Sequence, residues 1–363
     1  MRKGVGWVLC ALALGALATG CGDKKEKQAG AKGPKAPPAG VVSGSSPSTQ
    51  PNKSPAAVDA FWNARAARAQ AFLLPAPRIR TKVPAQPKTK ARIVPPVTAA
   101  GDKISLTPPL KASSRKEDRV EWNGPWDGPT GSTVGRIFWT EGKYVYSCSG
   151  TLVNSENQST VWTAGHCVHG GAGQTFHKDW VFAPGYHAGQ APYGFWPARP
   201  GGMFVLKKWS RNGSLLFDLG AVSVAPRNGQ TLMATVGGAQ GITFNQPASQ
   251  FFYDFGYPAD KPYDGEHLYI CRAGTQNRQY PVNVSVVNGK YVAPIGGRID
   301  GPATIGITCD MTGGASGGGW LVSYDGTWGW VDSVNSTGNG QMMWGPYLGN
   351  DAATLFNAVR KYQ

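Results

Sequence analysis

From about Trp122 to the C-terminus, the sequence is built of short runs of Val, Ile, Thr, Tyr and Trp separated by Gly, Asn and Asp. Clear examples of such runs are Val134–Trp139, Tyr144–Val153, Phe217–Val224 and Tyr280–Val287. Many short strands with turn residues between them are typical of a β-sandwich or a β-barrel. We therefore predict that this part of the chain is all-β.

One segment near the C-terminus departs from the strand pattern. In Asp351–Lys361, Leu355, Phe356 and Val359 lie on one side at helical spacing, and Asn350 or Asp351 is a candidate N-cap. This pattern predicts a short C-terminal helix.

The positive charge of the chain is concentrated ahead of the strand-rich region. Residues 22–133 contain 19 Lys and Arg against 8 Asp and Glu, whereas residues 134–363 contain 15 against 13. A basic folded face would indicate nucleic acid, but a basic, Pro-rich arm indicates an anionic surface such as a membrane or a wall polymer. Because no helix-turn-helix, RNA-binding or zinc motif is present, we expect no nucleic-acid partner.

The first 20 residues have the features of a secretory signal peptide. Two basic residues precede an apolar run, Val5–Leu17, and small residues follow it. A transmembrane anchor is the alternative, but the run is short for a span and rich in glycine. Leu17–Cys21 resembles the lipobox of bacterial lipoproteins, which implies lipidation of Cys21 and attachment to a membrane. Ordinary cleavage nearby is the alternative.

Two further segments precede the strand-rich region, which we take as one domain over residues 120–363. Residues 21–56 are rich in Gly, Ala, Pro, Ser and Lys, which predicts a disordered tether. Residues 57–119 are rich in Pro and Lys and are interpreted as a linker or a removable pro-segment. A helix-compatible pattern covers residues 57–73, so this stretch is either one short helix or a fluctuating stub.

Cysteines indicate a chain that leaves the cytoplasm. Two of the six lie in or beside the export signal, and the other four are Cys148, Cys167, Cys271 and Cys309. An even set in an exported chain predicts disulfides. Four cysteines allow three connectivities, of which we favour the sequence-near pairs Cys148–Cys167 and Cys271–Cys309. No C-x-x-C pair occurs, so we expect no metal site.

The strongest local signal is a serine surrounded by five glycines. Ser316 lies in Cys309–Trp320, and glycine permits the backbone angles of a tight turn that points amides inward. We expect the amides of Gly314 and Ser316 to stabilise an oxyanion. A flexible Gly-rich loop is the alternative. The motif also matches the G-x-S-x-G turn of α/β-hydrolases, but that fold places its His after the Ser, and no His follows Ser316.

A serine hydroxyl needs a base to become a nucleophile, and His166 is the candidate. Gly150–Val153 and Val161–Trp162 are predicted as two strands joined by a polar turn, which places His166 just beyond a buried strand. The neighbouring Cys167 would fix it in place through Cys148. The other four histidines are interpreted as structural or surface residues: His169, His177, His187 and His267.

These blocks together resemble the trypsin-like serine peptidases. Thr163–Cys167 is very similar to the block around the family's catalytic His. Ser147–Val153 is similar to the strand that precedes this block, and the loop around Ser316 is similar to the family's nucleophile loop. The resemblance covers roughly residues 120–363. It implies two antiparallel β-barrels with the active site between them, and a triad in the order His, Asp, Ser.

The third triad member is expected to be a carboxylate shielded from water, which orients the imidazole. Asp218 lies in the apolar segment Leu215–Val222 and resembles the family's catalytic Asp. The alternative is a turn carboxylate. Asp254, Asp260 and Asp264 are the competitors, but we interpret their surroundings as turns.

Two residues depart from the family pattern around the nucleophile. Ala315 replaces the Asp that receives the new N-terminal ammonium in animal members, so activation by that ion pair is not expected. Gly319 replaces the usual Pro, which loosens the turn. The change at Ala315 favours comparison with the bacterial branch.

Specificity is indicated by two features. Asp310 lies six residues before Ser316, where the resemblance implies a pocket for Lys or Arg; an exposed turn residue is the alternative. The run Ser333–Gly338 resembles the strand that pairs with substrate backbone, so Ser333, Asn335 and Ser336 are candidate substrate-binding residues.

The sequence thus predicts a secreted, membrane-tethered serine endopeptidase that acts on protein or peptide substrates as a monomer without a cofactor. The alternatives are a non-catalytic binding protein on the same fold, an esterase that uses the same residues, and a surface-attached structural protein.

Overall fold

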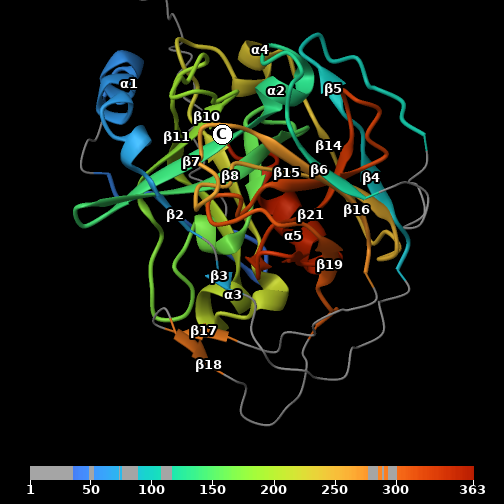
Figure 1. Cartoon of the computed structure of the whole chain (residues 1–363). Helices are drawn as coiled ribbons and strands as arrows, with labels where there is room; N and C mark the ends of the chain where they lie inside the picture. Colours follow the sequence, from blue (N-terminus) through green and yellow to red (C-terminus); the bar gives the residue numbers. More distant parts are fainter. Residues whose placement is uncertain are drawn as a thin grey trace, which may run out of the picture. The chain divides into compact units, whose positions relative to one another are not determined.

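Six strands close into an antiparallel barrel in the computed structural model of the protein (Figure 1). The structure describes residues 36–48, 53–72, 74–75, 89–107, 117–276, 285–287, 290–292 and 301–363. In order around the barrel, the strands are β7 (Val134–Glu141), β8 (Tyr144–Val153), β9 (Thr160–Thr163), β12 (Gly220–Val224), β11 (Trp196–Leu206) and β10 (Lys178–Pro184), and β10 pairs again with β7.

Large side chains are buried on both faces of this barrel. Ile137, Phe138, Trp162 and Val222 have no exposed surface, and the consecutive residues Ile137 and Phe138 point to opposite faces of β7. Burying each such side chain stabilises the fold by about 1.5–3 kcal/mol. The predicted strand Tyr144–Val153 has the same bounds in the structure.

The second half of the domain is built from two main sheets rather than one continuous ring of hydrogen bonds in the described residues. The larger sheet contains, in order, β4 (Arg92–Val94), β14 (Gly241–Phe244), β21 (Trp330–Val334), β20 (Gly319–Val322), β15 (Phe251–Gly256), β16 (Tyr269–Gly274) and β6 (Asp118–Glu121). The smaller contains β19 (Ile305–Thr308), β23 (Met342–Gly345), β22 (Thr337–Gly338) and β3 (Leu74–Pro75). A bridge between Thr275 and Ile307 links the two sheets, and the all-β fold class is confirmed.

Helices and small strand pairs complete the described chain. The helices are α1 (Pro55–Asn63), α2 (Pro129–Thr133), α3 (Lys207–Asn212), α4 (Leu232–Val236) and α5 (Asn350–Val359), with short 3₁₀ turns η1 (Ala66–Arg68), η2 (Gly165–Cys167) and η3 (Leu215–Phe217). The remaining pairs are β13 (Gly238–Ala239) with β5 (Val97–Thr98), and β17 (Ser285–Val287) with β18 (Lys290–Val292).

The C-terminal helix forms as predicted, but its cap differs. Helix α5 begins at Asn350, and its N-cap is Gly349, which has no capping side chain. Leu355, Phe356 and Val359 are buried, as the periodicity predicted. Asn350 instead accepts a hydrogen bond at its side-chain oxygen from the amide nitrogen Nδ2 of Asn245, at 2.9 Å.

Residues predicted as tether and linker are part of the folded unit, which spans Ala36–Gln363. Strand β1 (Val41–Gly44) pairs with β11, so the predicted disorder of residues 21–56 is wrong for this stretch. Helix α1 settles the choice between helix and stub, and its Trp62 is only 2 % exposed. Edge strands β4, β5 and β6 then add to the second half.

Both favoured disulfides are present. Cys148–Cys167 joins β8 to η2, and Cys271–Cys309 joins β16 to the segment after β19. No helix among the described residues is long and apolar enough to cross a membrane. The predicted signal peptide and Cys21 lie outside the described residues.

Candidate active site

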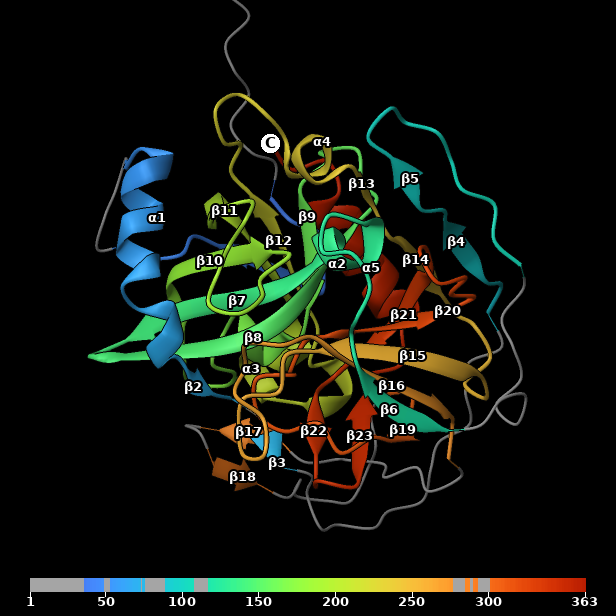
Figure 2. The ribbon, with the colours of Figure 1, turned by 45° about the horizontal axis from the view of Figure 1, so that its top comes forward.

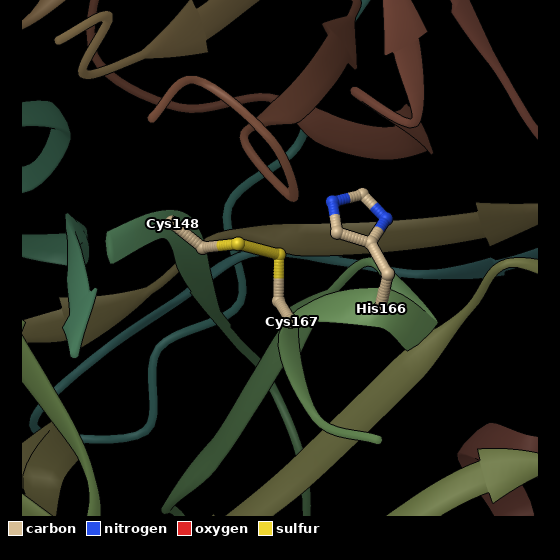
Figure 3. Close-up of side chains that lie close together, drawn as sticks. All are labelled: Cys148, His166 and Cys167. Carbon is tan, nitrogen blue, oxygen red and sulfur yellow. A yellow bond between two sulfur atoms is a disulfide. The ribbon is translucent and has the colours of Figure 1, made fainter. Parts of the chain in front are cut away.

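His166 is held at the end of a buried strand by its neighbours in sequence. Strand β9 ends at Thr163, and the chain turns directly into η2, which carries His166. The next residue is bonded to Cys148 of β8, so the turn is cross-linked to the adjacent strand (Figure 3). This arrangement limits the positions that the imidazole can adopt.

Asp218 holds His166 through two hydrogen bonds. The imidazole Nδ1 lies 2.7 Å from Oδ2 of Asp218, and the backbone N–H of His166 donates to Oδ1 at 2.7 Å. The hydroxyl of Ser336 also donates to Oδ2, at 2.6 Å. Asp218 has no exposed surface and His166 is 2 % exposed, so this pair is shielded from solvent screening.

Ser316 lies beside the same β8–η2 junction. Its carbonyl accepts a hydrogen bond from the N–H of Ser149 at 2.7 Å. The hydroxyl of Ser149 donates to the carbonyl of Gly314 at 2.9 Å, and it accepts from the N–H of Tyr257 at 2.9 Å. Ser149 was not predicted as a site residue, although it directly follows the half-cystine.

Asn335 fixes the nucleophile loop with both backbone and side chain. Its carbonyl accepts from the N–H of Gly317 at 2.7 Å, and its N–H donates to the carbonyl of Gly318 at 3.0 Å. Its side-chain Nδ2 donates to the carbonyl of Ala315 at 3.1 Å and to Oδ1 of Asp254 at 2.7 Å. Asn335 therefore supports the loop from behind.

The side chains of the predicted substrate-binding residues Ser333, Asn335 and Ser336 are buried, and each is bonded inside the protein. Ser333 donates to the carbonyl of Pro346 at 2.9 Å, and Ser336 donates to Asp218. The predicted pairing of this run with a substrate uses its backbone and stays a prediction.

Ala315 and Gly319, the two departures from the family pattern, both fit tightly packed positions. Ala315 has no exposed surface, and its Cβ would lie 2.8 Å from a Cβ added at Gly256. A Cβ added at Gly319 would lie 2.7 Å from Oγ1 of Thr151. Gly319 is thus the first residue of β20 and not a loosened turn, which corrects the expectation from the missing Pro.

Gly314 occupies a position that only glycine fits well. Its φ is +96°, and an added Cβ would lie 2.5 Å from the carbonyl oxygen of Tyr257. Its N–H, one of the two predicted oxyanion donors, donates to the carbonyl oxygen of Phe72 at 3.1 Å. A backbone carbonyl therefore already lies where the sequence predicted that an oxyanion would bind.

Two atoms that acyl transfer requires have no other use in the structure. Among the described residues, Oγ of Ser316 and Nε2 of His166 are both buried, and neither has a hydrogen-bond partner. Catalytic hydrogen bonds are often long before substrate binds, and they tighten in the reactive complex. Among the described residues, His166 is thus bonded to Asp218, while the hydroxyl of Ser316 and Nε2 of His166 share no hydrogen bond.

A second histidine supports the turn that carries His166. Nε2 of His177 lies 2.8 Å from the carbonyl oxygen of His166, which requires a proton on that nitrogen. Burial lowers the pKa of His177 to about 4, so it is neutral at pH 7 and donates one N–H to this carbonyl. His177 is a structural residue, as interpreted from the sequence.

Asp310 faces a cation of the same chain. It pairs with Nε of Arg119 at 3.3 Å and accepts from the hydroxyl of Tyr263 at 3.2 Å. Its side chain is 45 % exposed, so the pair is partly screened by solvent. A basic substrate side chain would have to compete with Arg119 for this carboxylate.

Asp254 is neither a turn residue nor exposed. It lies within β15, it has no exposed surface, and burial raises its pKa well above the ordinary value. The sequence Phe251–Gly256 is apolar around it, and this was the signal for a buried strand. Burial leaves Asp254 as a hydrogen-bonding partner of Asn335 and not as a member of the His166 cluster.

The described residues contain two close groups of metal-binding residue types, namely Cys148, His166 and Cys167, and Asp254, Cys271 and Cys309. In each group, both cysteines form a disulfide with each other. Disulfide sulfur is not a thiolate ligand, so these groups do not fit a metal ion.

Comparison with solved structures identifies the class of protein. The chain is 34 % identical to a thermostable serine protease, AL20, from an extremophilic microorganism. The aligned region covers 66 % of this chain and all of AL20, with a TM-score of 0.56. The chain is also 35 % identical to the protease Anisep from Arthrobacter nicotinovorans, and that alignment covers 63 % of this chain and 95 % of Anisep, with a TM-score of 0.54. No protein-family model and no curated protein matches the sequence.

The chain therefore belongs to the chymotrypsin-fold serine proteases. The matched share excludes about a third of the chain.

Proposed function

We propose that the protein is a secreted serine endopeptidase with Ser316 as nucleophile, His166 as general base and acid, and Asp218 as the residue that orients His166. The observation that carries this proposal is the 2.7 Å contact between His166 Nδ1 and Asp218 Oδ2. Nε2 of His166 and the hydroxyl of Ser316 are both buried and without a hydrogen-bond partner among the described residues, which supports the proposal. Membership of a serine protease family supports the reaction class.

In the first half-reaction, Oγ of Ser316 attacks the carbonyl carbon of a peptide bond while its proton passes to Nε2 of His166. The imidazolium that forms is stabilised by the buried carboxylate of Asp218. The amides of Gly314 and Ser316 donate to the oxyanion, and each donor contributes about 10²–10³ in rate. The C–N bond then breaks, and the amine leaves with the proton from Nε2.

In the second half-reaction, a water molecule attacks the acyl-enzyme. His166 takes one proton from the water and returns it to Oγ of Ser316, which releases the carboxylic acid product. Ser336 supports both steps because its hydroxyl donates to Asp218 and holds the carboxylate in place. Every proton transfer thus uses residues of this chain.

The experiment that tests this proposal is labelling with a fluorophosphonate, followed by peptide mapping. We expect one adduct, on Ser316, and its loss in Ser316→Ala. Ser210→Ala is the matched control, because Ser210 lies on α3 and donates to the carbonyl of Lys207 outside the site. Absence of an adduct from every variant would favour the alternative of a non-catalytic binding protein.

Substrate class separates the remaining alternative, an esterase. The wild-type protein should hydrolyse a casein-like protein as well as small activated esters. Turnover of esters without turnover of protein would defeat the endopeptidase proposal.

Cleavage after Lys or Arg stays a prediction from Asp310. A peptide-library cleavage profile of the wild type and of Asp310→Ala tests it, because the variant should lose any basic preference. An unchanged profile would assign Asp310 to its ion pair with Arg119 alone.

We also propose an extracytoplasmic location with a lipid anchor at Cys21. The two disulfides support an oxidising compartment. Cys21→Ala should release the protein from the membrane fraction, and unchanged fractionation would contradict the anchor.

A further inference from the structure

A segment ahead of the predicted catalytic domain crosses the candidate active site. We define it as the strap: Gln70–Phe72 and Leu74–Pro75. Strand β2 (Gln70–Ala71) pairs in parallel with Tyr146–Ser147 of β8 on one side of the site. Strand β3 pairs in parallel with β22 on the other side, and Figure 2 shows β3 beside β22. The strap thus joins the edges of both halves of the domain.

Phe72 lies at the centre of the strap and contacts the candidate catalytic residues. Its carbonyl oxygen accepts the N–H of Gly314 at 3.1 Å. Its ring lies 5.4 Å from the His166 ring, between centroids, and 5.7 and 5.9 Å from the rings of Trp139 and Tyr146. Phe72 therefore fills an aromatic pocket beside His166 and occupies one predicted oxyanion donor.

The preceding residue of the strap packs directly on the nucleophile loop. A Cβ added at Gly313 would lie 2.6 Å from Oδ2 of Asp260 and 2.9 Å from Cβ of Ala71, so the strap and Asp260 together leave no room for a side chain there. Ser316, three residues further along this loop, has no exposed surface. A substrate that reaches Ser316 must therefore enter a closed site.

The chain is anchored ahead of the strap. Trp62 of α1 is buried, with its ring 5.9 Å from Phe138 and 6.3 Å from Phe195. Asp59 of the same helix pairs with Arg227 at 2.7 Å. After the strap, β4 and β5 pair with β14 and β13. Because both ends are tied to the domain, the strap has a high effective concentration at the site.

We propose that the strap is a built-in inhibitor that occupies the catalytic cleft of its own chain. This inference rests on the proposed function. The carbonyl of Phe72 occupies the Gly314 amide, the Phe72 ring lies against the His166 ring, and Ala71 packs on the nucleophile loop at Gly313. Substrate therefore binds only the fraction of molecules in which the strap has left, and apparent affinity falls in proportion to that fraction.

The strap is bound as an inhibitor and not as a substrate. The Phe72 carbonyl oxygen bonds to the Gly314 amide alone, and no second hydrogen bond from the Ser316 amide to this oxygen completes an oxyanion site among the described residues. Both strap pairings are parallel. A peptide that crosses in the opposite direction would pair antiparallel with both edges, which is slightly more stable per residue. Such a peptide can replace the strap once the contacts of α1 or of β4 and β5 with the domain are broken.

The test compares the rate of fluorophosphonate labelling of Ser316 in the full-length wild type, Phe72→Ala and Tyr362→Ala. Tyr362→Ala is the matched control, because its ring packs on Phe204 and its hydroxyl donates to the carbonyl of Pro200, away from the strap and its anchors. Phe72→Ala should label about tenfold faster than the wild type, which corresponds to about 1.4 kcal/mol in the free energy of strap release. Tyr362→Ala should label at the wild-type rate. Equal rates in all three proteins would overturn the proposal.

A second measurement does not depend on activity. Hydrogen exchange at the Gly314 amide is compared between full-length Ser316→Ala and Ser316→Ala/Phe72→Ala. Exchange should be faster in the double variant, because the Phe72 carbonyl then leaves Gly314 more often. If exchange is faster in the double variant but no protein with Ser316 is labelled, the proposed function is wrong and the strap proposal stands. If Ser316 is labelled but neither the exchange nor the labelling rate changes with Phe72→Ala, only the strap proposal is wrong. Mass spectra that show self-cleavage after Phe72 would also contradict the strap proposal.

Discussion

Replacing Asn335 with alanine should destabilise the protein more than any exposed Asn→Ala change. The side chain accepts from Nε1 of Trp320 at 2.7 Å and donates to Oδ1 of Asp254 at 2.7 Å, and all three groups are buried. The carbonyl of Ala315 would keep its bond from the N–H of Gly318 at 3.0 Å. Two buried groups would therefore lose their partner.

Each buried polar group without a partner costs about 1–3 kcal/mol, so we expect Asn335→Ala to lower the free energy of unfolding by about 2–6 kcal/mol. Urea unfolding followed by tryptophan fluorescence measures this change. Asn357→Ala is the matched control, because Asn357 is exposed and accepts only from Arg92, and it should cost below about 1 kcal/mol. A loss for Asn335→Ala as small as that of the control would refute the reasoning.

Three further changes test other parts of the structure. Cys148→Ala/Cys167→Ala opens a loop of 19 residues and should lower the free energy of unfolding by about 3 kcal/mol; equal urea midpoints would contradict this. The pKa of the buried His177 is lowered to about 4, so the unfolded chain binds a proton at this residue between pH 6.5 and 4 while the folded protein does not. The free energy of unfolding of the wild type therefore falls as the pH is lowered through this range. In His177→Gln this fall should be smaller by up to about 3 kcal/mol, and parallel pH profiles of the two proteins would refute the assignment. Burial raises the pKa of Asp254, so above pH 3.8 the unfolded chain releases a proton that the folded protein keeps, and the wild type loses stability as the pH rises. Asp254→Asn should therefore be more stable relative to the wild type at pH 8 than at pH 4. A difference between the two proteins that does not change with pH would exclude this cause.

The parts of the fold that the sequence predicted have strong local signals. Strand β8 begins with Tyr-Val-Tyr and ends with Thr-Leu-Val, which favour a strand, and its bounds match the prediction. His166 and Ser316 lie in blocks whose residue types indicate their conformation, because a half-cystine follows His166 and the glycines around Ser316 permit a tight turn. The two disulfides joined the sequence-near cysteines, as favoured.

The N-terminal region was misjudged because its order depends on distant partners. Val41 and Leu74 are buried, yet each lies in a stretch too short and too rich in Pro, Ala or Lys to show a period, and the helical pattern around Trp62 did not show that this side chain is buried. Their stability comes from strand edges and aromatic pockets of the domain, which local propensity does not contain. For the same reason, the contact between Phe72 and Gly314 had no signal in the sequence.

Side-chain contacts were the other limit. The sequence predicted that residues 333–338 pair with an extended chain through their backbone, and Thr337–Gly338 of this run pairs with the strap. The bonds of the Ser333 and Asn335 side chains to distant groups inside the protein had no local signal.

Ser316 and His166 should act as one catalytic unit, and a double-variant cycle that compares kcat tests this most directly. Casein hydrolysis is measured for the wild type, His166→Ala, Ser316→Ala and the double variant. The account predicts that each single change lowers kcat by about 10⁶, and that the double variant is no worse than either single variant. Losses that multiply in the double variant, or a His166→Ala variant as active as the wild type, would contradict it.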